Sequence, residues 1–211
     1  MMESRTLQLD GLRVSRETTD KLAAFADLFR KWAKAINLVA PSTAGDLWNR
    51  HIADSAQVFA LNPQPITWVD LGSGGGFPGI ITAILLSENE AGWVHLVESN
   101  HKKASFLRNA ILQTGARASV HPVRIEDAPK EIPQCDAISA RALADLSDLC
   151  GYALPWALAS PQMRLFLHKG RDYAREIEVA RSSWGFDLVK HQSQIDRESV
   201  ILELSNLTLK R

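Results

Sequence analysis

Apolar residues follow a helical spacing through the first part of the chain. Between Thr18 and Ile36 they recur every three or four positions, which predicts one amphipathic helix. Pro41 should stop this helix, and Ser42 or Thr43 can cap a second helix over residues 47–59. The apolar positions of the first helix are Leu22, Phe25, Leu28, Phe29, Trp32 and Ile36.

From Ile66 onward, short apolar runs alternate with helical stretches. The runs read "ITWVDL", "WVHLVE", "ASVHPV", "CDAISA" and "MRLFLH", and the intervening helices include "HKKASFLRNAILQ", "ALADLSDLCGYAL" and residues 172–181. Two final runs, "FDLVKHQ" and "SVILELSNL", follow each other without a helix. This pattern predicts an α/β, Rossmann-like core with a mostly parallel seven-stranded sheet and an antiparallel last strand. We expect an N-terminal helical cap over residues 1–62 and the core over residues 63–211, in one structural unit.

A glycine-rich segment follows the first predicted strand directly. Residues 69–80 read "VDLGSGGGFPGI", in which Asp70, Gly72, Gly74 and Gly76 are spaced two apart. Ligands of open parallel sheets bind beyond the carboxyl ends of the strands, and glycines there allow positive φ and close approach to a ligand. This register resembles the motif of S-adenosylmethionine-dependent methyltransferases, whose cofactor carries an ammonium that suits a carboxylate such as Asp70.

The same glycines leave a dinucleotide interpretation open. Gly74-x-Gly76-x-x-Gly79 matches the G-x-G-x-x-G pattern of NAD sites. That match begins three residues after Leu71, whereas the NAD pattern places its first glycine immediately after the strand. An oxidoreductase would also need a hydride-transfer base, and we find no candidate for one. The pattern therefore favours S-adenosylmethionine.

The next two strand ends carry residues that suit a nucleoside. Glu98 ends the second predicted strand, where a carboxylate can accept hydrogen bonds from both ribose hydroxyls. Ile125 and Glu126 follow the third strand, where they could cover an adenine and meet its amine. A ribose carboxylate also occurs in NAD sites, and Glu98 could instead be an exposed acid that caps the following helix. These residues support a nucleoside cofactor without deciding which one.

Composition and charge restrict the possible functions. The 211 residues carry 24 basic and 24 acidic side chains, so a broad basic surface for nucleic acid is excluded and any basic surface must be local. The apolar runs are too short to span a bilayer and the N-terminus lacks a signal-peptide core, so we expect a cytoplasmic protein. Cys135 and Cys150 have no metal-ligand spacing and are expected as buried thiols.

Seven segments together resemble one family. They are "NLVA" (37–40), "RHIADS" (50–55), "VDLGSGGGFPGI" (69–80), "VESNHKKASFLR" (97–108), "RIED" (124–127), "SARALADL" (139–146) and "HKG" (168–170). In order and spacing they resemble the bacterial small-subunit (16S) ribosomal RNA guanine-N7 methyltransferases, also called glucose-inhibited division protein B. The resemblance implies cofactor contacts at Gly72, Phe77, Ile125, Glu126 and Arg141.

The resemblance also implies a reaction. In that family, S-adenosylmethionine methylates N7 of one guanine in 16S ribosomal RNA near the decoding region. N7 carries an unprotonated lone pair and the methyl group sits on an activated sulfonium, so in-line transfer requires no general base, nucleophile or metal. Orientation in a water-poor pocket can supply on the order of 7–11 kcal/mol of the barrier reduction. The sequence shows no Ser-His-Asp set, nucleophilic cysteine or metal cluster, as this mechanism predicts.

Basic residues offer candidate contacts with RNA. Lys102 and Lys103 open the helix after Glu98, where the helix dipole disfavours cations unless phosphates compensate them. With Arg141 and Lys169 they could form a basic rim around the pocket, although such runs are often solvated helix faces. Further candidates for this rim are Arg16, Arg30, Lys31 and Lys34. The expected partner is 16S ribosomal RNA within the small subunit or an assembly intermediate, bound by a monomer.

The segment "RHIADS" invites a catalytic interpretation. His51 and Asp54 are three residues apart, which places them on one face of the predicted helix. A histidine and an aspartate at this spacing more often form a structural pair, so we expect Arg50, His51 and Asp54 to position the cap or the substrate. Three alternatives stay open: a methyltransferase of the same fold acting on a small molecule or protein, a NAD-linked oxidoreductase, and a non-catalytic binding module.

Overall fold

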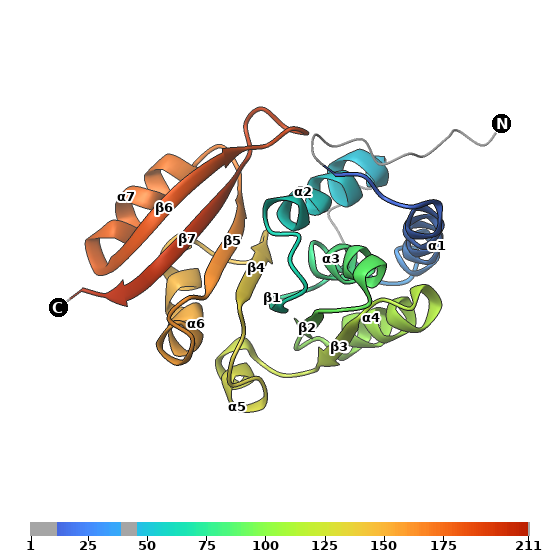
Figure 1. The fold of residues 1–211 in the computed structure, drawn as a ribbon, viewed down its shortest axis with the longest axis horizontal. Coiled ribbons are helices and arrows are strands. Elements are labelled where there is room, and N and C mark those ends of the chain that lie inside the picture. Colours follow the sequence, from blue (N-terminus) through green and yellow to red (C-terminus); the bar gives the residue numbers. More distant parts are fainter. Residues whose placement is uncertain (1–11, 39–45, 211) are drawn as a thin grey trace.

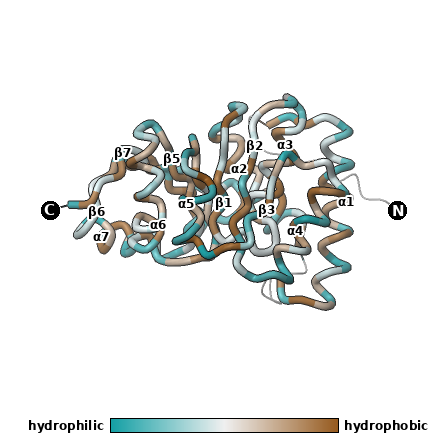
Figure 2. The backbone as a smooth tube through the Cα atoms, turned by 90° about the horizontal axis from the view of Figure 1, so that it is seen from below, coloured by the Kyte–Doolittle hydropathy of each residue, from teal (hydrophilic) through white to brown (hydrophobic). Residues whose placement is uncertain are grey.

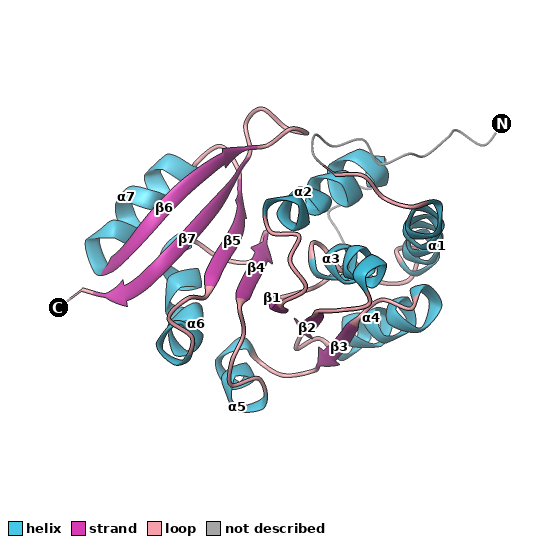
Figure 3. Cartoon of the chain, in the orientation of Figure 1, coloured by secondary structure: helices cyan, strands magenta, loops and turns pink. Residues whose placement is uncertain are grey.

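The computed structural model describes residues 12–38 and 46–210, which form one twisted sheet with helices on both faces (Figures 1 and 3). Pro41, Ser42 and Thr43, for which the sequence predicts a helix end and a cap, lie outside the described residues. The strands are β1 (Thr67–Leu71), β2 (Trp93–Val97), β3 (Ala118–His121), β4 (Ala137–Arg141), β5 (Arg164–Lys169), β6 (Trp184–Gln192) and β7 (Val200–Leu209).

The sheet has the order β3-β2-β1-β4-β5-β7-β6. Strands β1 to β5 pair in parallel, and β7 runs antiparallel to both β5 and β6. The predicted mostly parallel sheet with an antiparallel last strand is therefore confirmed. The order of strands reverses between β1 and β4, so the carboxyl ends of these two strands mark the switch point where such sheets bind ligands.

The helices divide between the two faces of the sheet. On one face α1 (Arg16–Trp32), α2 (Asp54–Leu61), α3 (Gly79–Leu86) and α4 (His101–Thr114) share a hydrophobic core with alternate strand residues such as Trp68. On the other face α6 (Leu146–Ala159), the short α5 (Ala128–Glu131) and α7 (Tyr173–Ser183) pack on residues such as Val69. Neighbouring residues of β1 thus face opposite cores, because side chains alternate along a strand.

The N-terminal helix contributes directly to the core of the sheet. Phe25 and Phe29 lie with their ring centroids 5.6 and 5.4 Å from that of Phe77, and Trp32 lies 5.8 Å from Phe106 on α4. This confirms core packing for Trp32. Figure 2 shows α1 banded between hydrophilic and hydrophobic residues, as the amphipathic spacing predicts. The boundary between cap and core near residue 62 stays a prediction.

The second predicted helix is not uniform. Trp48–Ala53 forms a π-helical turn and only Asp54–Leu61 is α-helical. The amide of Asp54 bonds to Asn49 O and His51 O, instead of to Arg50 O as an α-helix would require. Sequence periodicity cannot reveal such a turn, because it inserts one residue without changing the apolar character of the segment.

Two helix boundaries also differ from those predicted. Helix α1 ends at Trp32 instead of Ile36, with turns following. The predicted helix over "ALADLSDLCGYAL" begins only at Leu146, and residues 142–145 form a loop in which Ala142 has φ +51°. Tertiary contacts of this loop, described below, outweigh its helical propensity. No helix among the described residues is long and apolar enough to cross a membrane.

Candidate active site

The glycine turn between β1 and α3 has the backbone conformation that its sequence predicts. Gly72, Gly74 and Gly76 have φ of +62°, +51° and +89°, which residues with a Cβ rarely adopt. A Cβ on Gly72 would lie 2.7 Å from Leu143 Cδ1, so this position also needs a glycine for space. The turn therefore exposes main chain at the switch point of the sheet.

Asp70 lies beneath this turn. Its carboxylate is fully buried and accepts a hydrogen bond of 2.6 Å from Ser139 Oγ on β4. Burial raises the pKa of Asp70 to about 6, although hydrogen bonds from Ser139, Ser73 and the Gly79 amide oppose the shift. A direct contact between Asp70 and a cofactor ammonium stays a prediction. The carboxylate supports the turn from below instead of lining an open surface.

Glu98 joins the ends of β1 and β2. Its side chain accepts hydrogen bonds from Gly74 N at 2.9 Å and from Asn100 N at 2.7 Å. Asn100, and not Glu98, caps α4, since its Oδ1 accepts from the amides of Lys102 and Lys103. The capping interpretation of Glu98 is therefore wrong. Sequence reasoning missed Asn100, although an asparagine just before a helix is a common N-cap.

The other residues predicted near the cofactor occupy different environments. Ile125 and Glu126 form part of a short 3-10 turn after β3, with Ile125 half-buried and Glu126 exposed. The ring of Phe77 turns into the cap, where its centroid lies 5.0 Å from that of His51. A cofactor contact of Phe77 would thus come from its backbone in the turn.

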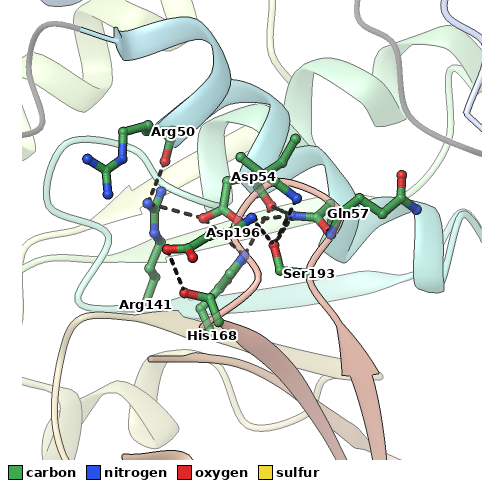
Figure 4. A network of polar contacts seen from close by, with 10 residues as sticks. Arg50, Asp54, Gln57, Arg141, His168, Ser193 and Asp196 are labelled. Atoms are coloured by element: carbon green, nitrogen blue, oxygen red, sulfur yellow. Dashed lines mark hydrogen bonds and ion pairs between the residues drawn. The ribbon is translucent and has the colours of Figure 1, made fainter. Parts of the chain in front are cut away.

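A polar network joins the cap to the ends of β4 and β5 (Figure 4). Arg141 Nη2 lies 3.1 Å from Asp54 Oδ2 and donates to Arg50 O at 2.7 Å. Arg141 Nη1 is buried and has no hydrogen-bond partner within the described residues. Burial lowers the pKa of Arg141, an effect that Asp54 opposes, and a guanidinium keeps its charge in proteins. Arg141 therefore carries a buried, unsatisfied donor, and it directly follows Ala140, which pairs with the last residue before the glycine turn.

His168 on β5 belongs to the same network. Its Nε2 lies 3.0 Å from Asp54 O, and burial lowers its pKa below the ordinary value, so the ring is neutral near pH 7. Asp54 thus meets a histidine of the core, while His51 packs against Phe77. The π turn gives His51 and Asp54 a different angular spacing from that of an α-helix, and a direct pairing of the two stays a prediction.

A cavity of about 1030 Å³ opens beside this network. Its wall is formed by the π turn, the loop after β4, the end of β5 and the β6–β7 loop. Of the predicted site residues, Arg50, Asp54, Arg141 and Lys169 line it, whereas the glycine turn, Glu98, Ile125 and Glu126 do not. The site therefore has two halves, one at β1 to β3 and one at β4 and β5. They adjoin at Arg141 and at Leu143, which lies over Gly72.

The lysines of the predicted basic rim differ in environment. Lys169 is buried, and its Nζ donates to Ala144 O at 2.7 Å and to Glu176 at 2.6 Å. Glu176 also accepts from Leu146 N, so this ion pair fixes the loop that lines the cavity. Lys102 is exposed on α4 and Lys103 is half-buried. Contacts of these residues with RNA stay predictions, and the geometry favours Lys102 over Lys169.

Cys135 and Cys150 are free and buried as predicted, and burial raises the pKa of each to about 12, so neither is nucleophilic near neutral pH. Among the described residues there is no group of three or more histidine, cysteine, aspartate or glutamate side chains that could hold a metal ion.

The strand order, the antiparallel β7, the glycine turn and the acid after β2 define a Rossmann-like methyltransferase of the S-adenosylmethionine-dependent class. Solved structures share the fold. The O-methyltransferase of Bacillus cereus in complex with S-adenosylhomocysteine is 15% identical with a TM-score of 0.58, covering 92% of each chain. The S-adenosylhomocysteine-bound Podospora anserina methyltransferase PaMTH1 is 12% identical with a TM-score of 0.62, covering 95% of this chain and 98% of its own.

The particular family follows from closer relatives. The family model of rRNA small subunit methyltransferase G matches residues 18–200. Ribosomal RNA small subunit methyltransferase G of Rhizobium johnstonii is 67% identical over 201 residues, covering 95% of this chain and 98% of its own. That of Rhizobium meliloti is 65% identical over 209 residues, covering 99% and 98%. The chain belongs to the rRNA small subunit methyltransferase G family.

S-adenosylmethionine is the cofactor of this class, and the residues present fit it. Three positive-φ glycines leave main chain open for close approach. The unpartnered Nη1 of Arg141 suits the carboxylate of an amino acid, and Glu98 suits a ribose. Charged and polar groups of the correct kinds are thus already present at the switch point.

Proposed function

We propose that the protein transfers a methyl group from S-adenosylmethionine to N7 of one guanine in 16S ribosomal RNA. The main supporting observation is that a cavity large enough for a nucleotide adjoins the glycine turn, since its lining includes Ala140, which pairs with Leu71, and Leu143, which lies over Gly72. Its volume of about 1030 Å³ is at the upper end of the range for small-molecule sites, roughly 300–1,000 Å³. A cofactor and a base can therefore meet at the boundary between the two halves.

The glycine half would hold the cofactor, which supplies a methyl group on a sulfonium when bound. The turn after β1 would bind its amino-acid end, with Arg141 Nη1 donating to the carboxylate and Asp70 favouring the ammonium from below. Glu98 would accept from the ribose hydroxyls, since a carboxylate that already accepts two amides has further lone pairs free. Ile125 and Glu126 would cover and meet the adenine.

The cavity half would hold the guanine. N7 needs no deprotonation before it attacks, so the cavity residues act by orienting the base and excluding water. Its walls include the carboxylates of Asp46, Asp54, Asp196 and Glu198. These negative charges favour a product base that becomes cationic on N7 methylation.

The RNA would extend from the cavity over the surface of the protein. Arg50 is exposed at the rim and Lys102 is exposed on α4, and both suit phosphate groups. We propose further that the protein acts in the cytoplasm as a monomer on the small ribosomal subunit or an assembly intermediate. Residues 1–62 would act as the cap of a core over residues 63–211, within one structural unit.

The proposal is tested by methyl transfer. The protein is incubated with labelled S-adenosylmethionine and small subunits that lack their own N7 methylation, and the label is mapped. We expect one labelled 7-methylguanine in 16S ribosomal RNA, lost in Arg141→Ala and retained in the control Arg175→Ala on the exposed side of α7. Label on a protein or small molecule, or on another atom of RNA, would contradict the proposed substrate.

A further inference from the structure

Asp54 lies between Arg141 and Gln57 and contacts both of them (Figure 4). We propose that Asp54 is a positioning residue, whose carboxylate orients Arg141 toward the cofactor and, through Gln57, holds the β6–β7 loop that walls the cavity. This inference rests on the proposed function, because it assigns the two halves to cofactor and base.

One carboxylate oxygen acts on Arg141. Asp54 Oδ2 lies 3.1 Å from Arg141 Nη2, which also donates to Arg50 O at 2.7 Å. With Nη2 held by two acceptors, the planar guanidinium has a fixed orientation, and its buried Nη1 is left without a partner in the described part of the chain. The same contacts that hold one nitrogen thus leave the other available to a cofactor carboxylate.

The π turn makes this arrangement possible. In an α-helix the amide of Asp54 would bond to Arg50 O. Here it bonds to Asn49 O and His51 O, and Arg50 O accepts from Arg141 instead. The π turn therefore places a backbone acceptor, Arg50 O, and the carboxylate of Asp54 within reach of one arginine.

The other carboxylate oxygen acts on the cavity wall. Asp54 Oδ1 accepts from Gln57 Nε2 at 2.9 Å, which places the buried amide of Gln57 between the cap and the β6–β7 loop. Gln57 Nε2 also donates to Ser193 Oγ at 3.2 Å, and Gln57 Oε1 accepts from Gln194 N at 2.7 Å. Ser193 Oγ in turn accepts from the amides of Ile195 and Asp196, so the loop is ordered from this point.

A carboxylate is required because both oxygens are used. Asparagine replaces one of these oxygens by an NH2 group, which would face a donor of either Arg141 or Gln57. The charge matters as well, because Asp54 is the anion in contact with a half-buried guanidinium. Asp54→Asn should therefore release one of its two partners and weaken the hold on both halves.

The test measures cofactor binding and turnover separately. S-adenosylhomocysteine binding is measured by calorimetry in wild type, Asp54→Asn, Arg141→Ala and the double variant. We expect Asp54→Asn to weaken binding about tenfold, the equivalent of one charge-assisted hydrogen bond, and to add no further loss to Arg141→Ala. Asp27→Asn is the matched control, since it removes the same charge from an exposed ion pair with Arg30 on the same cap.

A second readout addresses the cavity side. In the methyl-transfer assay, Gln57→Met is expected to raise KM for small subunits about fivefold or more while leaving the dissociation constant of S-adenosylhomocysteine unchanged. Asp54→Asn is expected to change both, and Asp54→Glu, which keeps two charged oxygens, to recover part of each. If these residues had a purely structural role, the variants would lose thermal stability, and cofactor binding and KM for small subunits would not change separately.

Several results would overturn the inference. Unchanged or tighter cofactor binding in Asp54→Asn would mean that Asp54 does not orient Arg141, and an additive loss in the double variant would mean that the two act independently. If Asp54→Asn fails to fold, Arg141→Lys tests the same contact, because lysine keeps the charge without the planar fork; wild-type affinity there would refute it. Methyl transfer by wild type is assayed separately, so absent RNA methylation with the expected binding pattern refutes the proposed substrate and leaves the cofactor role of Asp54 standing.

Discussion

The two halves of the site are built in different ways. The half at β1 to β3 is made largely of backbone: a turn of positive-φ glycines whose amide at Gly74 is held by Glu98. The half at β4 and β5 is made of side chains that arrive from four separate segments, among them Asp54, Arg141 and His168. A cofactor common to a whole class of enzymes meets general backbone features, whereas a particular substrate meets side chains that the fold assembles.

The two halves also differ in the partners of their charged side chains. In the backbone half, Asp70 is a buried acid whose pKa burial raises to about 6, and its partner Ser139 is a neutral hydroxyl. In the side-chain half, Asp54 faces the guanidinium of Arg141 and Glu176 faces Lys169. Changes in pH should therefore act first on the glycine half, and loss of a single ion pair should act on the cavity half.

The largest expected effect comes from filling the space over the glycine turn. Gly72→Val would place a Cβ 2.7 Å from Leu143 Cδ1 in a residue with φ +62°. We expect S-adenosylhomocysteine binding to fall by about a thousandfold or more, a loss of roughly 4 kcal/mol, because the side chain occupies the close-approach surface. Calorimetric titration measures the change.

Gly115→Val is the matched control for this variant. Gly115 has φ +64°, nearly the same strain, but a Cβ there would meet no atom within 4 Å. Its binding constant should stay within about twofold of wild type while its stability falls by about 1–2 kcal/mol. Equal binding losses in the two variants would show that strain, and not the surface over the turn, determines cofactor affinity.

The next effect concerns Asp70 and pH. A folded pKa of about 6 against an ordinary value of 3.8 means that the native state binds the proton more tightly. Proton binding by Asp70 therefore stabilises the native state below about pH 4, and this stabilisation is lost as pH rises through 6. Near pH 7.5 the free energy of unfolding of Asp70→Asn should therefore exceed that of wild type by up to about 3 kcal/mol. Near pH 4 most of this difference should disappear.

Urea unfolding of both proteins across this pH range measures the difference. The same variant near pH 3 is its own control for the geometric effect of the amide, because Asp70 is mostly protonated there in both states. If the stability difference between the two proteins does not vary with pH, burial does not raise the pKa of Asp70 in the glycine half.

The smallest effect concerns the exposed surface. Lys102→Ala should weaken binding to small subunits a few-fold and reduce the salt slope of the binding constant by about one, as expected of a single phosphate contact. Lys190→Ala, an exposed lysine on β6, should leave both unchanged. Filter binding at several salt concentrations checks this, and equal behaviour of the two variants would remove α4 from the RNA interface.

The glycine half could be predicted from the sequence because it is local. Asp70, Gly72, Gly74 and Gly76 lie within seven residues, and strand order alone places Glu98 beside them. The parallel sheet followed from the alternation of apolar runs and helices. These features depend on chain-local geometry, which periodicity and glycine placement express directly.

The cavity half could not be predicted in the same way. The contacts of Asp54 with Arg141 and His168 join residues 87 and 114 positions away, and a single sequence carries no signal for such pairs. The sequence suggested His51 as a partner of Asp54 and Lys169 as part of a basic rim. In the structure His168 lies beside Asp54, and Lys169 forms an ion pair with Glu176. The π turn and the loop at residues 142–145 were also hidden, because tertiary contacts determine both.

A crystal structure with S-adenosylhomocysteine would test the division of the site most directly. We predict that the amino-acid end lies against the turn at residues 72–77 within reach of Arg141 Nη1, that Glu98 meets the ribose, and that the cavity at β4 and β5 stays open beside the sulfur. S-adenosylhomocysteine bound inside that cavity, with the glycine turn and Glu98 uncontacted, would contradict the account.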